Sequence, residues 1–558
     1  MTVHTEDRAS TEGARARLFT GGTVWPDALS PDSDALLIAD GAVVALGAQA
    51  VAHPLAAEAE QIDLAGGFLM PSFAEGHAHP IFGGLESQGP QIVGLDSVEA
   101  IIAEVRRYAD ANPTEEWIIG ASYNGSLVEH GLFDARWLDE AVPDRPVLLR
   151  AWDYHTVWCN SRALELAGIT ANTPEPELGE IPRRPDGSPL GVLREWGAID
   201  LINAVQPGHS LDARLTALRT AHEHYAALGT TWIQDAWVEP ADVEVYVAAA
   251  ARGQLLTRMN LALLADPRHF PAQLPELLAA RQRIRDLGHP LLTANTIKFF
   301  ADGVIENETG ALLEPYCTGA HQGMRVWQPE ALAAAVAAVE AEGFQPFIHA
   351  IGDAAVRTAL DAIEHSRTVN GEPGTRPVIT HVQLAAAEDL ARFARLGVIA
   401  NLQPLWSQQD SLMTVLTVPR LGPERSDRQY QSKTLTDSGA TVSFGSDWPC
   451  SSADVREGIA IAATRTTADG APEGGWVPEQ ILPLGTCLGL ATAGTAAQAF
   501  ADRLDTPWGT LAPGNAADLV WFARDPRAES PKSFPDNPIR ATFLAGTPTY
   551  RANTERAW

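Results

Sequence analysis

Short apolar runs alternate with amphipathic stretches along the second half of the chain. Residues 344–349 form an apolar run, and residues 354–367 repeat apolar positions at the spacing of a helix face. Residues 378–381 and the helical stretch 386–396 repeat this pair of patterns, and two further apolar runs follow at 398–402 and 441–444. Strands that alternate with helices favour βαβ units and a parallel sheet.

The first half of the chain holds more strand candidates than a barrel needs. The apolar runs are 68–73, 117–120, 147–150, 231–234, 259–264 and 296–300. Together with the later runs they exceed the eight strands of a (β/α)₈ barrel by one or two, so we expect some to belong to excursions. The Gly/Pro-rich stretch 171–191 is expected to be such an excursion, for example a lid.

The two ends of the chain have β patterns without intervening helices. Residues 36–47 are two strand-like runs across the Asp40-Gly41 turn, which is a hairpin signal. Near the other end, the turn-forming residues 509–514 lead into the apolar run 517–522. We therefore expect N- and C-terminal strands to pair in one composite domain beside the barrel.

Length and composition narrow the class of protein. A chain of 558 residues suggests a large domain with a smaller companion, and its net charge of −30 disfavours nucleic acid and anionic membrane surfaces as partners. The four cysteines include no C-x-x-C pair, which disfavours a disulfide framework and a thiolate zinc site. With a polar N-terminus and no long apolar segment, we expect a soluble, cytoplasmic protein.

His77 and His79 follow the apolar run 68–73, where a strand opens into a loop. In extended chain, residues two apart point to the same side. Two neutral imidazoles that converge on one point are ligands that zinc binds well. Two loop histidines without a ligand are the alternative. His222 and His224 have the same spacing but lie in a helical stretch, where residues two apart diverge, so we set them aside.

Three more candidates lie at ends of predicted strands. Lys298 has apolar neighbours, and a buried lysine that loses its proton can capture carbon dioxide as a carbamate that bridges two cations. Its alternative is a structural salt bridge. His349 and His381 end their apolar runs, and each alone could be a core histidine with ordinary hydrogen-bond partners.

Asp447 follows the predicted strand 441–444 in a turn of small residues. A carboxylate there can ligate a metal and accept a proton from bound water, although capping the next helix is the alternative. Six metal-competent side chains at successive strand ends match the face where barrel enzymes place their active sites. The combined pattern favours a metal centre over the separate alternatives.

With these motifs, the chain resembles the amidohydrolase superfamily, most closely its YtcJ-like amidohydrolase-3 branch, which includes N-substituted formamide deformylases. The matching stretches are MPSFAEGHAH at 70–79, DYHTVWCNSRAL at 153–164, IKFFADG at 297–303, IHAIGDAA at 348–355, THVQ at 380–383, GSDWP at 445–449 and residues 509–522. They span nearly the whole chain in the expected order.

The resemblance implies a ligand set and a domain layout. His77, His79 and Asp447 would hold one divalent ion, His349 and His381 a second, and a carboxylated Lys298 both. It also implies a β-sandwich built from residues 1–72 and 485–558 around a TIM barrel at 73–484, with insertions at about 105–225. Substrate contacts are expected from His155, Asp302 and Trp448, and Asp302 is also expected to support the lysine loop.

The sequence departs from the family pattern at three places. Glu75 replaces the usual Asp, Ser72 replaces a usual Gly, and residues 304–312 lack the commoner serine-rich version. Neither Glu75 nor Ser72 is expected to be a ligand. Because of the third departure, the sequence does not determine the shape of the pocket wall, and hence it does not identify the substrate.

We therefore expect a metal-dependent hydrolase that cleaves a non-peptide C–N bond, of an amide or N-substituted formamide, by metal-activated hydroxide. Asp447 would act as base and then as acid. Zinc is the default metal, with one or two ions, and iron or manganese as alternatives. The partner would be a small molecule, and a homodimer is left open.

Three alternatives remain from the sequence. A one-metal deaminase of the same superfamily would lack the bridging lysine and carry Glu at the position of Gly352. An ester or lactone hydrolase would use the same hydroxide. A non-catalytic binding or regulatory protein on the same scaffold would usually have lost ligands that are all present here.

Overall fold

Eight parallel strands form the centre of the computed structural model, which describes residues 16–552. In sheet order they run from β17 back to β6, and a parallel bridge between Ala78 and Trp448 brings the two edge strands together. The strands are β6 (Phe73–Ala78), β11 (Thr230–Val238), β12 (Arg258–Leu264), β13 (Leu292–Phe300), β14 (Gln345–Ala350), β15 (Val378–His381), β16 (Ile399–Leu402) and β17 (Thr441–Phe444). This nearly closed barrel confirms the (β/α)₈ prediction.

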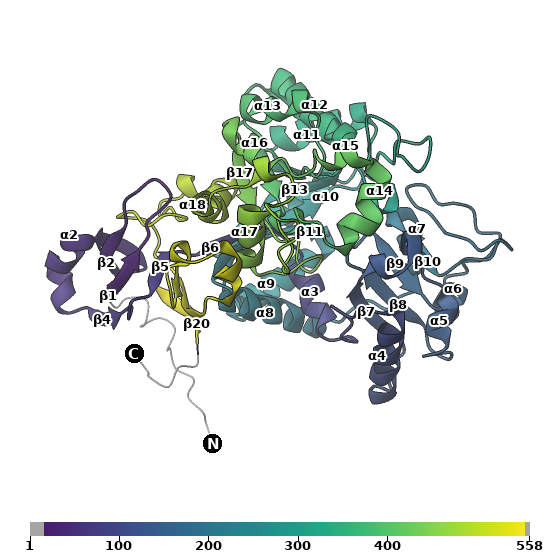
Figure 1. The fold of residues 1–558 in the computed structure, drawn as a ribbon, viewed down its shortest axis with the longest axis horizontal. Coiled ribbons are helices and arrows are strands. Elements are labelled where there is room, and N and C mark those ends of the chain that lie inside the picture. The colour runs from purple at the N-terminus through teal and green to yellow at the C-terminus, as the bar shows by residue number, and fades with distance from the viewer. Residues whose placement is uncertain (1–15, 553–558) are drawn as a thin grey trace.

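Helices form the outer layer of the barrel (Figure 1). In α13, Leu390 and Phe393 are buried while Glu388 and Arg395 are exposed, and the helix ends at Gly397, whose φ of 62° suits glycine. The outer helices are α8 (Leu211–Ala227), α9 (Val243–Ala251), α10 (Leu274–Leu287), α11 (Pro329–Ala341), α12 (Asp353–Asn370), α13 (Ala387–Leu396), α16 (Ser432–Asp437) and α17 (Val455–Thr464). Hydrophobic periodicity predicted α12 and α13 to within a few residues.

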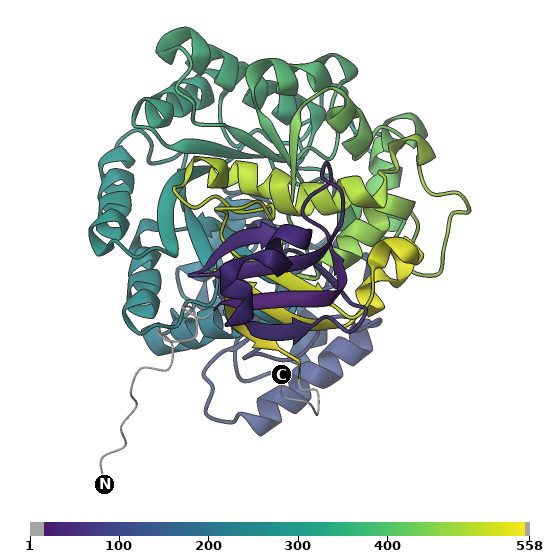
Figure 2. The same ribbon diagram turned by 90° about the vertical axis from the view of Figure 1, so that its left-hand side faces the viewer.

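Strands from both chain ends form one eight-stranded sheet beside the barrel, as Figure 2 shows with purple and yellow strands side by side. The strands are β1 (Arg17–Val24), β2 (Ser33–Ala39), β3 (Ala42–Leu46), β4 (Glu60–Asp63), β5 (Phe68–Pro71), β18 (Leu519–Phe522), β19 (Ile539–Leu544) and β20 (Thr547–Arg551). Strand β18 pairs with β5 on one side and β19 on the other. The two ends therefore complete one additional β domain, as expected.

The predicted hairpin at 36–47 is present as β2 and β3. Its turn residues Asp40 and Gly41 both have positive φ, 51° and 78°, as a two-residue hairpin turn with the twist of the strands requires.

The apolar run 68–73 is two strands, which corrects the prediction of one. Its first part is β5 of the terminal sheet and its end begins β6 of the barrel, with Ser72 at the junction and bonded to Thr231. All residues of both strands are buried, so no polar alternation marks the boundary. As a result His77 lies inside β6, and only His79 follows the strand.

An insertion between β6 and β11 carries a second small sheet. After α3 (Pro80–Glu86), the strands β7 (Ile118–Tyr123), β8 (Val147–Ala151), β9 (Thr156–Cys159) and β10 (Val192–Arg194) pair in sequence order. The helices here are α4 (Val98–Ala111), α5 (Ala135–Asp139), α6 (Ser161–Leu166) and α7 (Glu195–Asn203). The candidate strands at 117–120 and 147–150 belong to this sheet and not to the barrel, and Figure 1 shows it opposite the terminal sheet.

Across residues 16–552, no helix combines the length and the apolar character needed to cross a bilayer. The stretch 171–191 runs between α6 and β10.

Candidate metal centre and cavity

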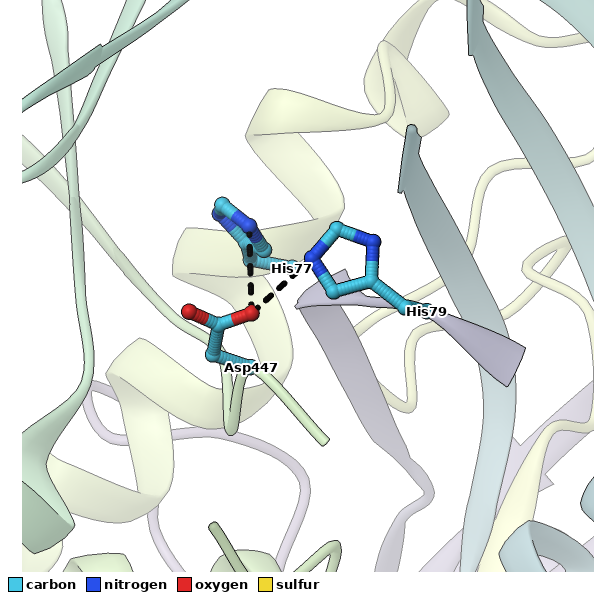
Figure 3. A group of neighbouring side chains, drawn as sticks. All are labelled: His77, His79 and Asp447. Atoms are coloured by element: carbon cyan, nitrogen blue, oxygen red, sulfur yellow. Dashed lines mark ion pairs between the residues drawn. The ribbon is translucent and has the colours of Figure 1, made fainter. Parts of the chain in front are cut away.

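Three of the predicted ligands meet at the carboxyl end of the barrel. His77 near the end of β6, His79 after it and Asp447 after β17 offer ligand atoms within 4.8 Å of one another (Figure 3). Oδ1 of Asp447 lies 3.0 Å from Nε2 of His79 and 3.4 Å from Nε2 of His77. All three side chains are buried. The barrel thus unites residues that are 370 positions apart.

The other two histidines lie next to this group. The ring of His381 is 4.8 Å from that of His77, and the ring of His349 is 4.6 Å from that of His381, measured between centroids. His381 ends β15 and His349 lies near the end of β14, the strand beside it. Both His381 and Asp447 have left-handed φ, 76° and 58°, which is uncommon outside glycine and concentrates at functional sites.

Hydrogen bonds behind the rings decide which nitrogen of each ring faces the centre. Thr380 Oγ1 contacts Nδ1 of His77 at 2.8 Å, and Oε1 of Gln403 contacts Nδ1 of His381 at 2.8 Å. Nε2 of His77 and of His381 is therefore the nitrogen left to bind a cation. His349 is held the other way round, because its Nε2 contacts the carbonyl oxygen of Gly303 at 3.0 Å and leaves Nδ1.

Lys298 lies in the same group, fully buried in β13. Its Nζ is 3.4 Å from Nε2 of His77 and lies near the rings of Phe300 and Phe347, at 4.6 Å and 5.2 Å from their centroids. Within residues 16–552, no carboxylate lies within ion-pair distance of it, so the salt-bridge alternative finds no partner. Burial lowers the pKa of Lys298 to about 7.

The donor set fits a divalent cation. Burial lowers the pKa of His77, His79, His349 and His381, so the imidazoles are neutral and their lone pairs are free. Oδ1 of Asp447 and Nδ1 of His79 are buried and lack a hydrogen-bond partner of good geometry. An unsatisfied buried carboxylate oxygen is costly, and a cation beside it would remove that cost.

The centre lies in a cavity of about 590 Å³. Every predicted ligand lines it, as do His155, Trp448, Trp152 and Trp406, and more aromatic walls come from Phe82, Tyr154, Trp196, Trp237, Phe300 and Tyr430. The ring of Trp406 stacks on that of His381 at 5.3 Å and 10°. Aromatic side chains therefore form much of the cavity wall around the candidate metal centre.

Asp302 lies behind the cavity instead of lining it. Its carboxylate accepts hydrogen bonds from the backbone N–H groups of Ala311, Ile351 and Gly352, at 2.8 to 3.0 Å. It also lies 3.5 Å from Nε2 of His349. Asp302 thus has contacts that support the loops beside Lys298 and His349, and the expected substrate contact has no geometric support.

Two residues that frame the centre were not singled out as functional from the sequence. Glu75 accepts hydrogen bonds from the backbone of His77 and from Ser446, and Gln403 orients His381. The sequence did mark Glu75, because the family usually has Asp at this position. Gln403 had none, because it lies after β16 among ordinary buried residues.

His155 comes from the insertion and reaches the centre from the side. Its ring centroid is 5.4 Å from that of His349, and its Nδ1 contacts Oε2 of Glu195 at 2.8 Å. Burial alone would lower the pKa of His155, but the charge of Glu195 and its hydrogen bond raise it to about 9.

Comparisons with known proteins place this chain in a family. The amidohydrolase family model matches residues 60–550. The putative amidohydrolase YtcJ of Bacillus subtilis is 28% identical over 88% of this chain and 91% of its own length. The N-substituted formamide deformylase of Arthrobacter pascens is 26% identical over 90% and 92%.

A solved structure has the same fold. The uncharacterized metal-dependent hydrolase of Pyrococcus horikoshii has a TM-score of 0.72 at 23% identity, over 92% of this chain and 99% of its own. Since the family model matches most of the chain in sequence, this chain belongs to the amidohydrolase family, in its YtcJ-like amidohydrolase-3 branch.

Proposed function

We propose that this chain is a metal-dependent amidohydrolase that cleaves a non-peptide C–N bond in an amide or N-substituted formamide. The observation that carries the proposal is the convergence of six metal-competent side chains in one aromatic cavity, and they are His77, His79, Lys298, His349, His381 and Asp447. The N-substituted formamide deformylase of Arthrobacter pascens, which is similar over nearly its whole length, supports the choice of bond.

The chain offers two adjoining sets of ligands. His77, His79 and Asp447 would hold one ion, His349 and His381 a second, and Lys298, as a carbamate, both. Zinc suits these nitrogen and oxygen donors, with iron or manganese as alternatives. A divalent ion bound there would supply Lewis acidity, which polarises a carbonyl and lowers the pKa of water.

The residues around the centre would handle the proton and the substrate. Asp447 takes the proton from the attacking water and passes it to the leaving nitrogen, so one carboxylate serves as base and then as acid. Its position supports this role, because Asp447 lines the cavity and its Oδ1 lies beside both imidazoles. Trp448 and Trp406 border the same space and would hold the rest of the substrate.

The deaminase alternative is less well supported by the site. A one-metal enzyme has no use for a buried lysine between two groups of histidines, yet Lys298 lies 3.4 Å from His77. Glycine also occupies position 352, where the deaminases carry their catalytic Glu. Esters and lactones remain alternative substrates of the same centre. A non-catalytic binding or regulatory protein on the same scaffold remains the alternative outside enzymes.

We further propose that the partner is a small molecule, that the chain acts in the cytoplasm and that neither nucleic acid nor a membrane is involved. The net charge of −30 supports the exclusion of nucleic acid and of an anionic membrane surface. A homodimer remains a proposal to be tested by solution mass measurement.

Metal analysis and an amide screen test the proposed function. We expect purified protein to contain one or two divalent ions per chain and to release amine from simple formamides. Asp447→Asn should lower kcat by about 100-fold or more at intact metal content. Metal-loaded protein that cleaves no amide, ester or lactone would favour the non-catalytic alternative, and near-normal turnover of Asp447→Asn would exclude the proton-transfer role.

A further inference from the structure

Glu195 lies at the first position of α7, in the insertion, and its side chain points back to the barrel. It is buried, with 1% of its surface exposed, and its two carboxylate oxygens have different partners. Oε2 contacts Nδ1 of His155 at 2.8 Å, and Oε1 accepts a hydrogen bond from the hydroxyl of Thr309. Both oxygens of a buried carboxylate are thus used to connect two segments.

The backbone of Glu195 is held in an uncommon conformation. Its φ is 60°, in the left-handed region that side chains other than glycine rarely adopt. Its N–H donates to the carbonyl oxygen of His155 at 2.8 Å. Strain of this kind persists where surrounding contacts over-determine it, and it concentrates at functional sites.

His155 is anchored at every polar atom except one. Its backbone N–H donates to Oδ1 of Asp153 at 2.8 Å, its carbonyl accepts from Glu195, and its Nδ1 is paired with the carboxylate. The imidazole lines the cavity beside His349. Nε2 is therefore the ring nitrogen left for a molecule in the cavity.

The Glu195 contact also reaches the loop that follows β13. Thr309 Oγ1 accepts from the N–H of Val304 at 2.9 Å, and Gly303, one residue earlier, contacts His349 through its carbonyl oxygen. A Cβ atom on Gly303 would lie 2.4 Å from Oε1 of Glu195, so this approach needs glycine. The carboxylate of Glu195 thus contacts both the insertion, through His155, and the loop that follows β13, through Thr309.

From this geometry we infer that Glu195 is a positioning residue that acts through His155, and that His155 Nε2 hydrogen-bonds the amide group of the substrate. The inference rests on the proposed amide hydrolysis. A carboxylate on Nδ1 keeps a proton on that nitrogen and fixes the rotation of the ring, and so directs the other nitrogen at the reacting group. The insertion would then contribute to the chemistry as well as to the cavity wall.

A double-mutant cycle tests whether Glu195 acts through His155. We expect Glu195→Ala to lower kcat by about 10- to 100-fold, with Glu195→Gln between it and the wild type, because an amide oxygen can still accept from Nδ1. In a His155→Ala background, Glu195→Ala should cause little further loss. An equal loss in both backgrounds would overturn the inference.

Glu340 provides a matched control for the loss of a buried carboxylate. It is 2% exposed, lies on α11 outside the cavity and also accepts a hydrogen bond from a threonine hydroxyl, that of Thr375. Glu340→Ala should lower the melting temperature, and its effect on kcat should be the same with and without His155. Metal content is measured for every variant, so that ligand loss is separated from loss of positioning.

A spectroscopic readout does not depend on turnover. In metal-free protein with ¹⁵N-labelled histidine, the Nδ1–H of His155 should give a strongly downfield proton signal, identified by its loss in His155→Ala. The signal should disappear or move upfield in Glu195→Ala and persist in Glu340→Ala. An unchanged signal in Glu195→Ala would overturn the inference, whereas failure of every amide to react, with the signal behaving as expected, would instead argue against the proposed function.

Discussion

The carboxylate of Glu75 accepts a hydrogen bond from the backbone N–H of Ser446 at 2.8 Å, which joins the first barrel strand to the turn after the last one. It also accepts from the Ser446 hydroxyl at 2.6 Å and from the N–H of His77 at 2.9 Å. The buried carboxylate of Glu75 therefore helps to hold His77 and Asp447 at their separation, together with the hydrogen bond from the backbone N–H of Asp447 to the carbonyl oxygen of His77 at 2.7 Å.

Replacing Glu75 should weaken metal binding without removing a ligand. We expect Glu75→Ala to lower metal affinity by about 10- to 100-fold, as loss of supporting hydrogen bonds does at metal sites. Glu75→Gln should keep part of the affinity, because one amide oxygen can still accept from Ser446 and His77. Competition with a chelator measures both variants, and wild-type affinity in Glu75→Ala would show that the turn is held by other contacts.

His77 and His222 form a matched pair for the ligand assignment. Both are buried histidines whose Nδ1 contacts a threonine hydroxyl, but His222 lies in α8 away from the cavity. His77→Ala should lose bound metal and activity, whereas His222→Ala should keep its metal. Elemental analysis after gel filtration decides between them; full metal occupancy in His77→Ala would contradict the assignment.

Lys298 should carry a carbamate in the metal-loaded protein. Protein prepared in ¹³C-bicarbonate is expected to show a carbamate carbon signal that Lys298→Ala lacks. The variant should also bind fewer ions, because the bridging oxygens are gone. Normal metal stoichiometry in Lys298→Ala, with no carbamate signal in the wild type, would remove the lysine from the ligand set.

Gly445 should tolerate no side chain. A Cβ atom there would lie 2.6 Å from the backbone nitrogen of His77 and 3.0 Å from Oε1 of Glu75. We expect Gly445→Ala to displace the Asp447 turn and to lower activity by about 10-fold or more. Gly343→Ala is a glycine control away from the site, since nothing lies within 4 Å of its added Cβ, although its φ of 75° will cost some stability.

His222 should make stability fall as the solution becomes acidic. Burial lowers the pKa of His222 to about 4, below the usual 6.5, so the unfolded chain binds a proton first as the pH falls. Its contribution is present above pH 6.5 and is lost as the pH falls toward 4, by roughly 2 kcal/mol between pH 7 and pH 5.

Thermal melts of wild type and His222→Gln across this pH range check the effect. The variant should lose less stability between pH 7 and pH 5 than the wild type, whatever its stability at pH 7. Parallel pH dependence in the two proteins would assign acid sensitivity to other groups.

The local pattern of apolar and polar residues alone predicted several strands and helices of this protein. Strand β15 occupies residues 378–381 as predicted, and α13 begins one residue after its predicted start, because the periodicity of buried side chains is a property of neighbours in sequence. The candidate ligands also came from the sequence, because each was expected at a strand end and barrel topology brings the carboxyl ends of the strands to one face.

Tertiary structure decided what depends on contacts between distant segments. The boundary at Ser72 between two sheets is invisible in a run where every residue is buried, and two apolar strands of the first half pair with each other outside the barrel. Glu195 had no distinguishing sequence pattern, since its role arises from contacts with His155 and with Thr309, 114 positions away. Hydrophobic periodicity records which face of an element is buried, but not against which partner, and that pairing is set by packing of the whole chain.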